Sequence, residues 1–318
     1  MVKVENLKAI EGGKAVEIEY LGSLLWMSVS NSVKIKAPEL EMELKGLGLE
    51  EFMPRKINPR DAFRRATRDV EVKREQYGEG TYINLLVRPV KTVGEVMVRQ
   101  LVREVVDGQN TQLAYEPVVQ FEIRDDGTHV ISPLVADLHE KEQSAMESVG
   151  PLYEEAMTTY EGDHLRRLIE RVLNKCAPIS VRPSGGVHFI PQKHVDDMDT
   201  LKVLVKKLAS YEEKQGATRI WSVPVIDAEE HREMVEESLE NQVMDGTLNM
   251  IEEMKKLVQD SSREVQTTTI QQYVYQIKKM NALVGDYEEM LEFQATQARE
   301  NLELAHHLAM KLMGKVEA

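Results

Sequence analysis

The sequence predicts an α+β fold, with a head built from an antiparallel β meander plus helices and a C-terminal antiparallel helical coiled-coil hairpin. Three observations carry this prediction. Apolar runs typical of strands alternate with Asp-Gly turns between residues 82 and 131, a heptad pattern of apolar residues begins at Ile270, and strand-like and helical segments occur in separate runs. The length of 318 residues allows more than one structural unit.

The first part of the head is expected to occupy residues 1–134. It opens with the strand-like stretches AVEIEYL, LLWMSVS and SVKIKA and the short helix PELEMELKGLGL. The meander follows as YINLLVRPV, VMVRQLVREVV, TQLAYEPVVQFEI and HVI, with turns at DGQN and DDGT. Val98, Leu101, Val102 and Val105 would also form one face of a helix, and we favour a strand because an Asp-Gly turn follows directly.

Residues 135–225 are expected to belong to the same head. A helical segment with Leu165, Leu168 and Val172 on its apolar face precedes the compact hairpin PISVRPSGGVHFIP. A helix over roughly 200–214 and the strand TRIWSVPVI complete this part of the chain.

Residues 226–318 are expected to form the helical hairpin. Apolar residues recur from Ile270 at alternating spacings of three and four, which predicts one long helix with a coiled-coil seam. An upstream helix within 227–258, followed by a turn at QDSSRE, is its expected partner. Because the second helix is the longer one, part of its seam stays unpaired and favours a homo-oligomer. The expected oligomerisation seam is Ile270, Tyr273, Ile277, Met280, Val284, Tyr287, Leu291, Leu308 and Leu312.

Composition limits the class of protein. Cys176 is the only cysteine, so the chain can form neither an intrachain disulfide nor a cysteine-rich zinc site. No apolar run approaches the roughly 20 residues that cross a bilayer, and the N-terminus lacks the apolar core of a signal peptide. We therefore expect a soluble, cytoplasmic protein that contacts no membrane.

The negative charge of the chain is concentrated at one end. The formal net charge is −14, and residues 226–318 contain 19 acidic and 9 basic residues, so that segment carries −10 of it. The net charge argues against nonspecific binding of polyanions by the whole molecule. Local basic patches nevertheless occur in the nearly neutral head.

The stretch NPRDAFRRATRDVEVKR predicts a helix with Asn58 as its N-cap and Pro59 at its first position. The face opposite its apolar residues carries four arginines, Arg60, Arg64, Arg65 and Arg68. Four guanidinium groups on one face would clamp phosphates of a nucleic acid or another anion. Ordinary ion pairs at helical spacing, for example with Asp61, or contact with the acidic coiled coil explain the same pattern.

The hairpin RPSGG offers a second candidate anion site. Arg182 and Lys193 flank a Gly-Gly turn whose backbone N–H groups would approach an anion closely. A tight hairpin also needs glycine for its backbone angles alone. The sequence leaves both explanations open.

For metals, the densest group of candidate ligands contains His188, His194 and Asp196. The acidic run also precedes a helix, where it would cap the N-terminus, so we expect no metal and no cofactor. The competing hypothesis is a metal-dependent nuclease or phosphohydrolase, in which Glu71 and Lys73 of VEVK join these residues in one cleft. The sequence contains no GxxxxGK[ST], GxSxG or HExxH motif.

Two phrases, INPRDAFRRAT and VRPSGGVHFIP, together with the long charged C-terminal helices, resemble an uncharacterised family of bacteriophage and haloarchaeal or mobile-element proteins of unknown function. This resemblance covers pieces of the head and implies an accessory protein of a phage or mobile element. It transfers neither a mechanism nor site residues.

These observations together predict a non-catalytic, self-associating interaction protein. Its expected partners are a second copy of the chain and either a host protein or a nucleic acid, bound through the basic patches of the head. The aromatic content of 5 % argues against recognition of single strands by stacking.

Overall fold

The computed structural model describes residues 8–11, 14–17, 19–182, 185–213, 216–259 and 266–316. Its antiparallel sheets and helices confirm the predicted α+β class. The chain forms two compact units. We call residues 31–165 the meander unit, and the described residues up to 30 together with those from 166 onward the bundle unit. The expected boundaries after residues 134 and 225 stay a prediction.

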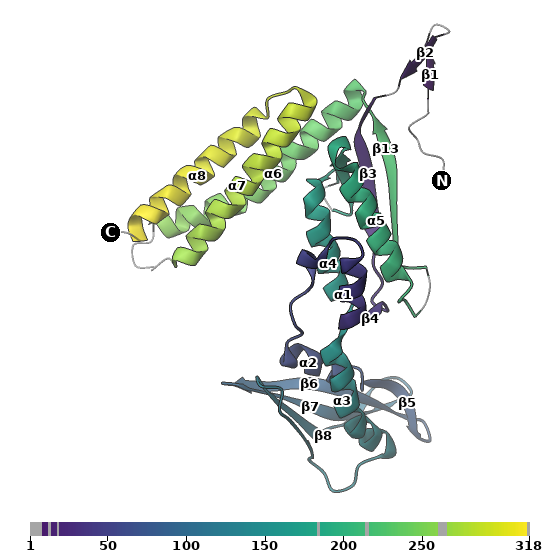
Figure 1. Ribbon diagram of the computed structural model, residues 1–318. Helices are drawn as coiled ribbons and strands as arrows, with labels where there is room; N and C mark the ends of the chain where they lie inside the picture. Colours follow the sequence, from purple (N-terminus) through teal and green to yellow (C-terminus); the bar gives the residue numbers. More distant parts are fainter. Residues whose placement is uncertain are drawn as a thin grey trace. The chain divides into compact units, whose positions relative to one another are not determined.

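The meander unit contains a five-stranded antiparallel sheet. Its strands are β5 (Val72–Gly78), β6 (Thr81–Val93), β7 (Val96–Asp107), β8 (Gln112–Arg124) and β9 (His129–Pro133), and each pairs with the next along the chain (Figure 1). Asp107 closes the turn between β7 and β8, since its carboxylate accepts the N–H groups of Gln109 and Thr111, both at 2.8 Å. The Asp-Gly turn and the strand at 96–107 are therefore both present as predicted.

Helices cover one face of this sheet. The unit also contains β4 (Lys34–Lys36), α1 (Ala37–Lys45), the 3-10 turn η2 (Glu50–Phe52), α2 (Pro59–Arg68), α3 (Glu140–Thr158) and β10 (Thr159–Glu161), and β10 pairs with β4. The Asn58 side chain accepts the Arg60 N–H and so caps α2 as expected. Phe63 of α2 is fully buried and meets Tyr153 of α3 edge to face, so α2 packs through its apolar side.

The bundle unit contains a second antiparallel sheet. Its strands run in the order β11 (Ile179–Ser180), β12 (Val187–Pro191), β3 (Tyr20–Ser28) and β13 (Arg219–Ile226), so β3 lies between strands from much later in the sequence. Gly22 is required here, because a Cβ atom at this position would lie 2.0 Å from the Ile190 carbonyl oxygen. An N-terminal hairpin pairs β1 (Lys8–Glu11) with β2 (Lys14–Glu17).

Four helical segments accompany this sheet. These are α4 (Gly162–Leu173), which begins just before the unit boundary, the 3-10 turns η3 (Asn174–Cys176) and η4 (Gln192–His194), and α5 (Val195–Ala209), which packs on β12 and β13. The predicted RPSGG hairpin joins β11 to β12, and its residues Pro183 and Ser184 lie outside the described residues.

Three C-terminal helices run side by side in the bundle unit (Figure 1). They are α6 (Glu229–Gln259), α7 (Thr267–Leu291) and α8 (Thr296–Val316), and residues 260–264 of the predicted QDSSRE turn lie outside the described residues. The seam expected on one rod is divided between α7 and α8. Glu292 takes a left-handed conformation with φ of 56°, which ends α7 and lets the chain fold back. The helical hairpin thus gains a third helix.

The predicted seam residues pack inside this bundle. Ile270, Ile277, Val284, Tyr287, Leu291, Leu308 and Leu312 are all buried, and Tyr273 and Met280 are partly buried against the same core. Folding back covers this apolar surface within the chain, where a single rod would have left it open. Among the described helices, none combines the length and apolar character that crossing a bilayer requires.

Candidate binding surfaces

The basic helix α2 uses two of its arginines for the structure of the meander unit. Arg65 has a side chain only 10 % exposed, donates to the carbonyls of Ala156 and Thr159 and lies 3.0 Å from the Glu161 carboxylate. Ala156 lies in the last turn of α3, and Thr159 and Glu161 lie in β10 directly after it. Arg65 therefore connects the end of α3 to α2 through hydrogen bonds and an ion pair.

Arg60 is also engaged in the fold. Its Nε lies 2.5 Å from the Asp125 carboxylate, and its Nη2 donates to the Gly94 carbonyl in the β6–β7 turn at 3.1 Å. The position of Arg60 is therefore set by two loops of the sheet, and its guanidinium already faces a carboxylate.

Arg64 and Arg68 remain on the surface. Arg64 is 58 % exposed and pairs with Asp61 at 2.7 Å, and Arg68 is exposed and lies 3.9 Å from Asp69. Exposed pairs of this kind contribute little to stability, so neither side chain is locked. The structure thus divides the predicted stripe into two structural and two exposed arginines, and binding of an anion by the exposed pair stays a prediction.

The hairpin residues Arg182 and Lys193 are not brought together. Arg182 is exposed at the turn before β12, whereas Lys193 follows the other end of β12 and pairs with Asp286 of α7 at 2.9 Å. Gly185 and Gly186 have φ angles of 70° and 88° and open space where a Cβ would be. Glycine is therefore required here for backbone conformation, as the alternative explanation of this motif states.

The candidate metal ligands occupy three different elements. His188 lies on β12, where burial lowers its pKa against an opposing effect of Glu170. His194 ends η4 with its Nδ1 3.6 Å from the Asp197 carboxylate, and Asp196 lies in the first turn of α5. Within the described ranges, no three His, Cys, Asp or Glu side chains are arranged to hold a metal ion.

The residues of the nuclease hypothesis lie in both units. Glu71 and Lys73 belong to the meander unit, and Glu71 accepts the Val87 N–H at 2.8 Å, which fixes its carboxylate beside β6. His188 and His194 belong to the bundle unit. The nuclease hypothesis therefore draws its residues from both units and stays a prediction.

An exposed aromatic surface lies on the sheet of the bundle unit. Trp26 of β3 and Trp221 of β13 are directly paired across the two strands, and they are the two tryptophans of the chain. Their rings stack with centroids 6.3 Å apart and an interplanar angle of 20°. Trp221 is 43 % exposed, and the Arg219 guanidinium lies 5.9 Å from the centre of its ring.

Strand alternation places further apolar side chains beside the two rings. Val223 of β13 is exposed on the same face as Trp221, and Val187 of β12 pairs with Trp26 from the other side. None of the four strands of this sheet contains an Asp or Glu residue. We call this surface, made of Trp26, Val187, Arg219, Trp221 and Val223, the tryptophan face.

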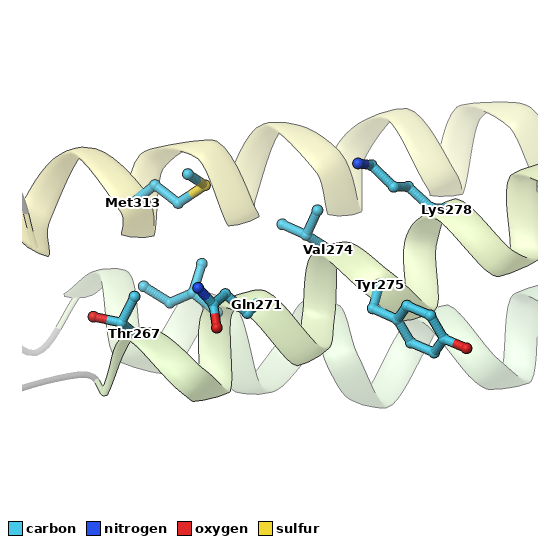
Figure 2. Close-up of a pocket in the computed structure, with 7 residues that line it drawn as sticks. Thr267, Gln271, Val274, Tyr275, Lys278 and Met313 are labelled. Atoms are coloured by element: carbon cyan, nitrogen blue, oxygen red, sulfur yellow. The ribbon is translucent and has the colours of Figure 1, made fainter.

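A second apolar surface is the groove between α7 and α8. It has a volume of about 290 Å³, and Figure 2 shows Val274 and Met313 pointing into it from the two helices. Tyr275 is 70 % exposed at its rim, and Met310, one turn before Met313 on α8, is exposed as well. The groove is lined by Thr267, Ile270, Gln271, Val274, Tyr275, Lys278 and Met313.

Comparison with protein families matches residues 20–318 to the family described as "Family of unknown function (DUF6744)". The chain belongs to DUF6744. The matched region includes every strand of the second sheet and all three bundle helices, so the tryptophan face and the α7–α8 groove both lie within the part shared with DUF6744. Neither the curated proteins nor the solved structures compared with this chain contain a significant match.

Sequence reasoning missed the tryptophan face of this DUF6744 chain. The stretches LLWMSVS and TRIWSVPVI were both predicted as strands, and each contains one tryptophan. Their alternation indicates that the tryptophans share a face with other apolar residues, but it does not show that β3 and β13 are neighbours. The overall aromatic content of 5 % does not indicate such a surface, although two rings at one place are enough to form one.

Proposed function

We propose that this DUF6744 protein is a non-catalytic interaction protein that self-associates through the α7–α8 groove. The observation that supports this is the open apolar groove of Figure 2, which is lined by the exposed side chains of Tyr275 and Met313 among others. Most residues of the predicted seam are covered inside the same bundle, which favours an interface at another surface. The proposed interface is therefore the outer edge of the bundle.

The proposed occupant of the groove is the same face of a second copy. Three helices leave one groove of a four-helix arrangement unfilled, and a helix from another chain would cover Val274 and Met313. Contiguous exposed apolar side chains commonly mark such contacts.

The charges beside the groove fit a two-fold arrangement. Lys278 of α7 lines the groove, and Glu303 lies seven residues before Met310, on the same side of α8. In a two-fold interface each surface meets itself, so Lys278 of one copy would face Glu303 of the other.

Sedimentation velocity of the full chain over a range of concentrations tests this proposal. We expect a dimer for the natural sequence and a monomer for the Tyr275→Asp, Met313→Asp double variant, because two buried carboxylates would face an apolar surface. Met42→Asp is the matched control, since Met42 is exposed on α1 of the meander unit. A monomeric natural chain, or a double variant that sediments as the natural chain does, would contradict the proposal.

We further propose an accessory role in a bacteriophage or mobile element, with a host protein or nucleic acid as partner, as the sequence resemblance implies. The exposed pair Arg64 and Arg68 supports contact with a polyanion. Charge reversal in Arg64→Glu, Arg68→Glu should weaken binding of DNA or RNA most at low salt. If neither salt nor the double variant changes the affinity, α2 is not part of the binding surface.

A further inference from the structure

The tryptophan face combines two features that single-stranded nucleic acids require of a protein surface. Bases stack on exposed aromatic rings irrespective of sequence, and cations beside the rings attract the phosphates. Trp26 and Trp221 supply two nearly parallel rings, and Arg219 supplies a guanidinium against the second ring.

The arrangement of the arginines around the rings is consistent with this chemistry. Arg219 is paired with Ser28 at the end of β3 that carries Trp26. On the other side, the Val181 N–H donates to the Val187 carbonyl, and Val187 is paired with Trp26, so Arg182 follows at the same end of the sheet. Arg219 and Arg182 therefore both belong to the end of the sheet that carries the tryptophans.

The charge of this face differs from that of the chain as a whole. The formal net charge is −14, yet the strands β3, β11, β12 and β13 contain no carboxylate. The acid Glu212, which precedes β13, is buried and accepts the Thr218 N–H at 3.1 Å, so its carboxylate is directed into the protein. The strands that carry the rings therefore present arginine and apolar side chains, without a carboxylate, to a polyanion.

We propose that the tryptophan face binds single-stranded nucleic acid, with bases stacked on Trp221 and Trp26 and phosphates beside Arg219 and Arg182. A duplex is excluded from this mode because its bases are already stacked on one another. The proposal names the partner class of the interaction protein proposed above, and it does not depend on self-association through α7 and α8.

Tryptophan fluorescence provides a direct measurement, because the two rings of this face are the only tryptophans of the chain. Titration of the full chain with an oligothymidine of about 15 nucleotides should quench the emission to saturation. The matching duplex should leave the emission unchanged at the same concentration. Increasing salt should weaken the quenching, since Arg219 and Arg182 act through charge.

Variants measured by anisotropy of a labelled oligothymidine assign the binding to this face. Trp221→Ala should raise the dissociation constant about tenfold or more, and Trp221→Phe should retain most of the affinity because a ring is kept. Arg219→Glu should weaken binding and lower its salt dependence. Tyr275→Ala, which removes an aromatic side chain exposed on α7, is the control and should bind as the natural chain does.

Three outcomes would overturn the proposal: no quenching by any single strand, equal quenching by duplex, or unchanged affinity in both Trp221→Ala and Arg219→Glu. Quenching by an apolar peptide in the absence of any response to oligothymidine would assign the face to a protein partner instead. Sedimentation separates this proposal from the previous one. A dimer that fails to bind oligothymidine refutes only the nucleic-acid site, and a monomer that binds it refutes only the self-association.

Discussion

Arg103 of β7 and Glu142 of α3 form a doubly hydrogen-bonded ion pair, with Nε–Oε1 at 2.5 Å and Nη2–Oε2 at 2.6 Å, and the Glu142 side chain is completely buried. The same carboxylate accepts the His139 N–H at 2.9 Å and so also caps α3. Glu142 raises the pKa of Arg103 above its ordinary value through this hydrogen bond. One side chain therefore joins the start of a helix to the centre of the meander.

Replacement of Glu142 in this ion pair should lower the free energy of unfolding. Glu142→Gln removes the buried carboxylate that pairs with Arg103 and leaves the exposed Glu116 as the remaining acid against this guanidinium. We expect a loss of about 3 kcal/mol in the free energy of unfolding, measured with urea. Glu116→Gln is the matched control, because Glu116 binds the same arginine at 2.6 Å from an exposed position. Its expected effect is below about 1 kcal/mol. Equal losses in the two variants would show that burial of Glu142 does not matter.

Truncation of two neighbouring arginines of α2 should change the free energy of unfolding by very different amounts. Arg65→Ala removes the donor to two buried carbonyls, Ala156 and Thr159, and leaves the Glu161 carboxylate without its partner, so we expect a loss of about 3 kcal/mol. Arg64→Ala should change stability by no more than about 0.5 kcal/mol, since Arg64 is exposed. Urea unfolding of the two variants checks this. A stripe used only for ligand binding would show small effects at both positions.

The Glu292→Gly variant tests the break between α7 and α8, because the break predicts a stabilising effect of glycine at this position. Glu292 has a left-handed conformation that costs a non-glycine residue about 1 kcal/mol, so Glu292→Gly should raise the midpoint of thermal unfolding. Glu289→Gly, inside α7, should lower it, because glycine destabilises a helix interior by about 1 kcal/mol. One continuous helix over 270–312 would instead be destabilised by both changes.

Tyr287 should make the stability of the bundle unit sensitive to alkaline pH. The ring is fully buried, its hydroxyl donates to the Ala177 carbonyl at 2.7 Å, and burial, with a contribution from Asp286, raises its pKa well above 10. Above about pH 10 the phenol ionises in the unfolded chain but stays protonated in the folded chain, so stability falls as the pH rises.

Comparison with Tyr287→Phe isolates this effect from that of the other tyrosines. We expect a loss of about 1 kcal/mol near neutral pH, because the Ala177 carbonyl loses its donor. Between about pH 9 and pH 11 the urea midpoint of the variant should fall less than that of the natural chain. Parallel pH profiles for the two proteins would contradict the role assigned to Tyr287.

Local patterns in the sequence are sufficient to predict much of the architecture. The Asp-Gly turns predict the hairpins of the meander because the Asp107 carboxylate can accept neighbouring N–H groups without help from distant residues. The cap at Asn58 and the apolar side of α2 follow in the same way from residues a few positions apart. The heptad spacing correctly marks which side chains of α7 and α8 are buried, as Ile277 and Leu312 show.

The candidate sites depended on contacts that no local pattern contains. Arg64 and Arg65 are adjacent in sequence and equally basic, and only the packing of α3 against α2 makes one of them structural and leaves the other exposed. The break at Glu292 carries no Gly or Pro signal in the sequence EFQA, and it arises because folding back covers the seam.

The sequence by itself determined the α+β class, the meander, the cap of α2 and the apolar faces of the helices, because each follows from residues within a turn or two of one another. Tertiary structure decided which surfaces cover these faces. It placed Trp26 beside Trp221 and divided the seam into a three-helix bundle. An apolar pattern fixes which side chains leave water, whereas the choice of partner depends on the free energy of burying distant surfaces together.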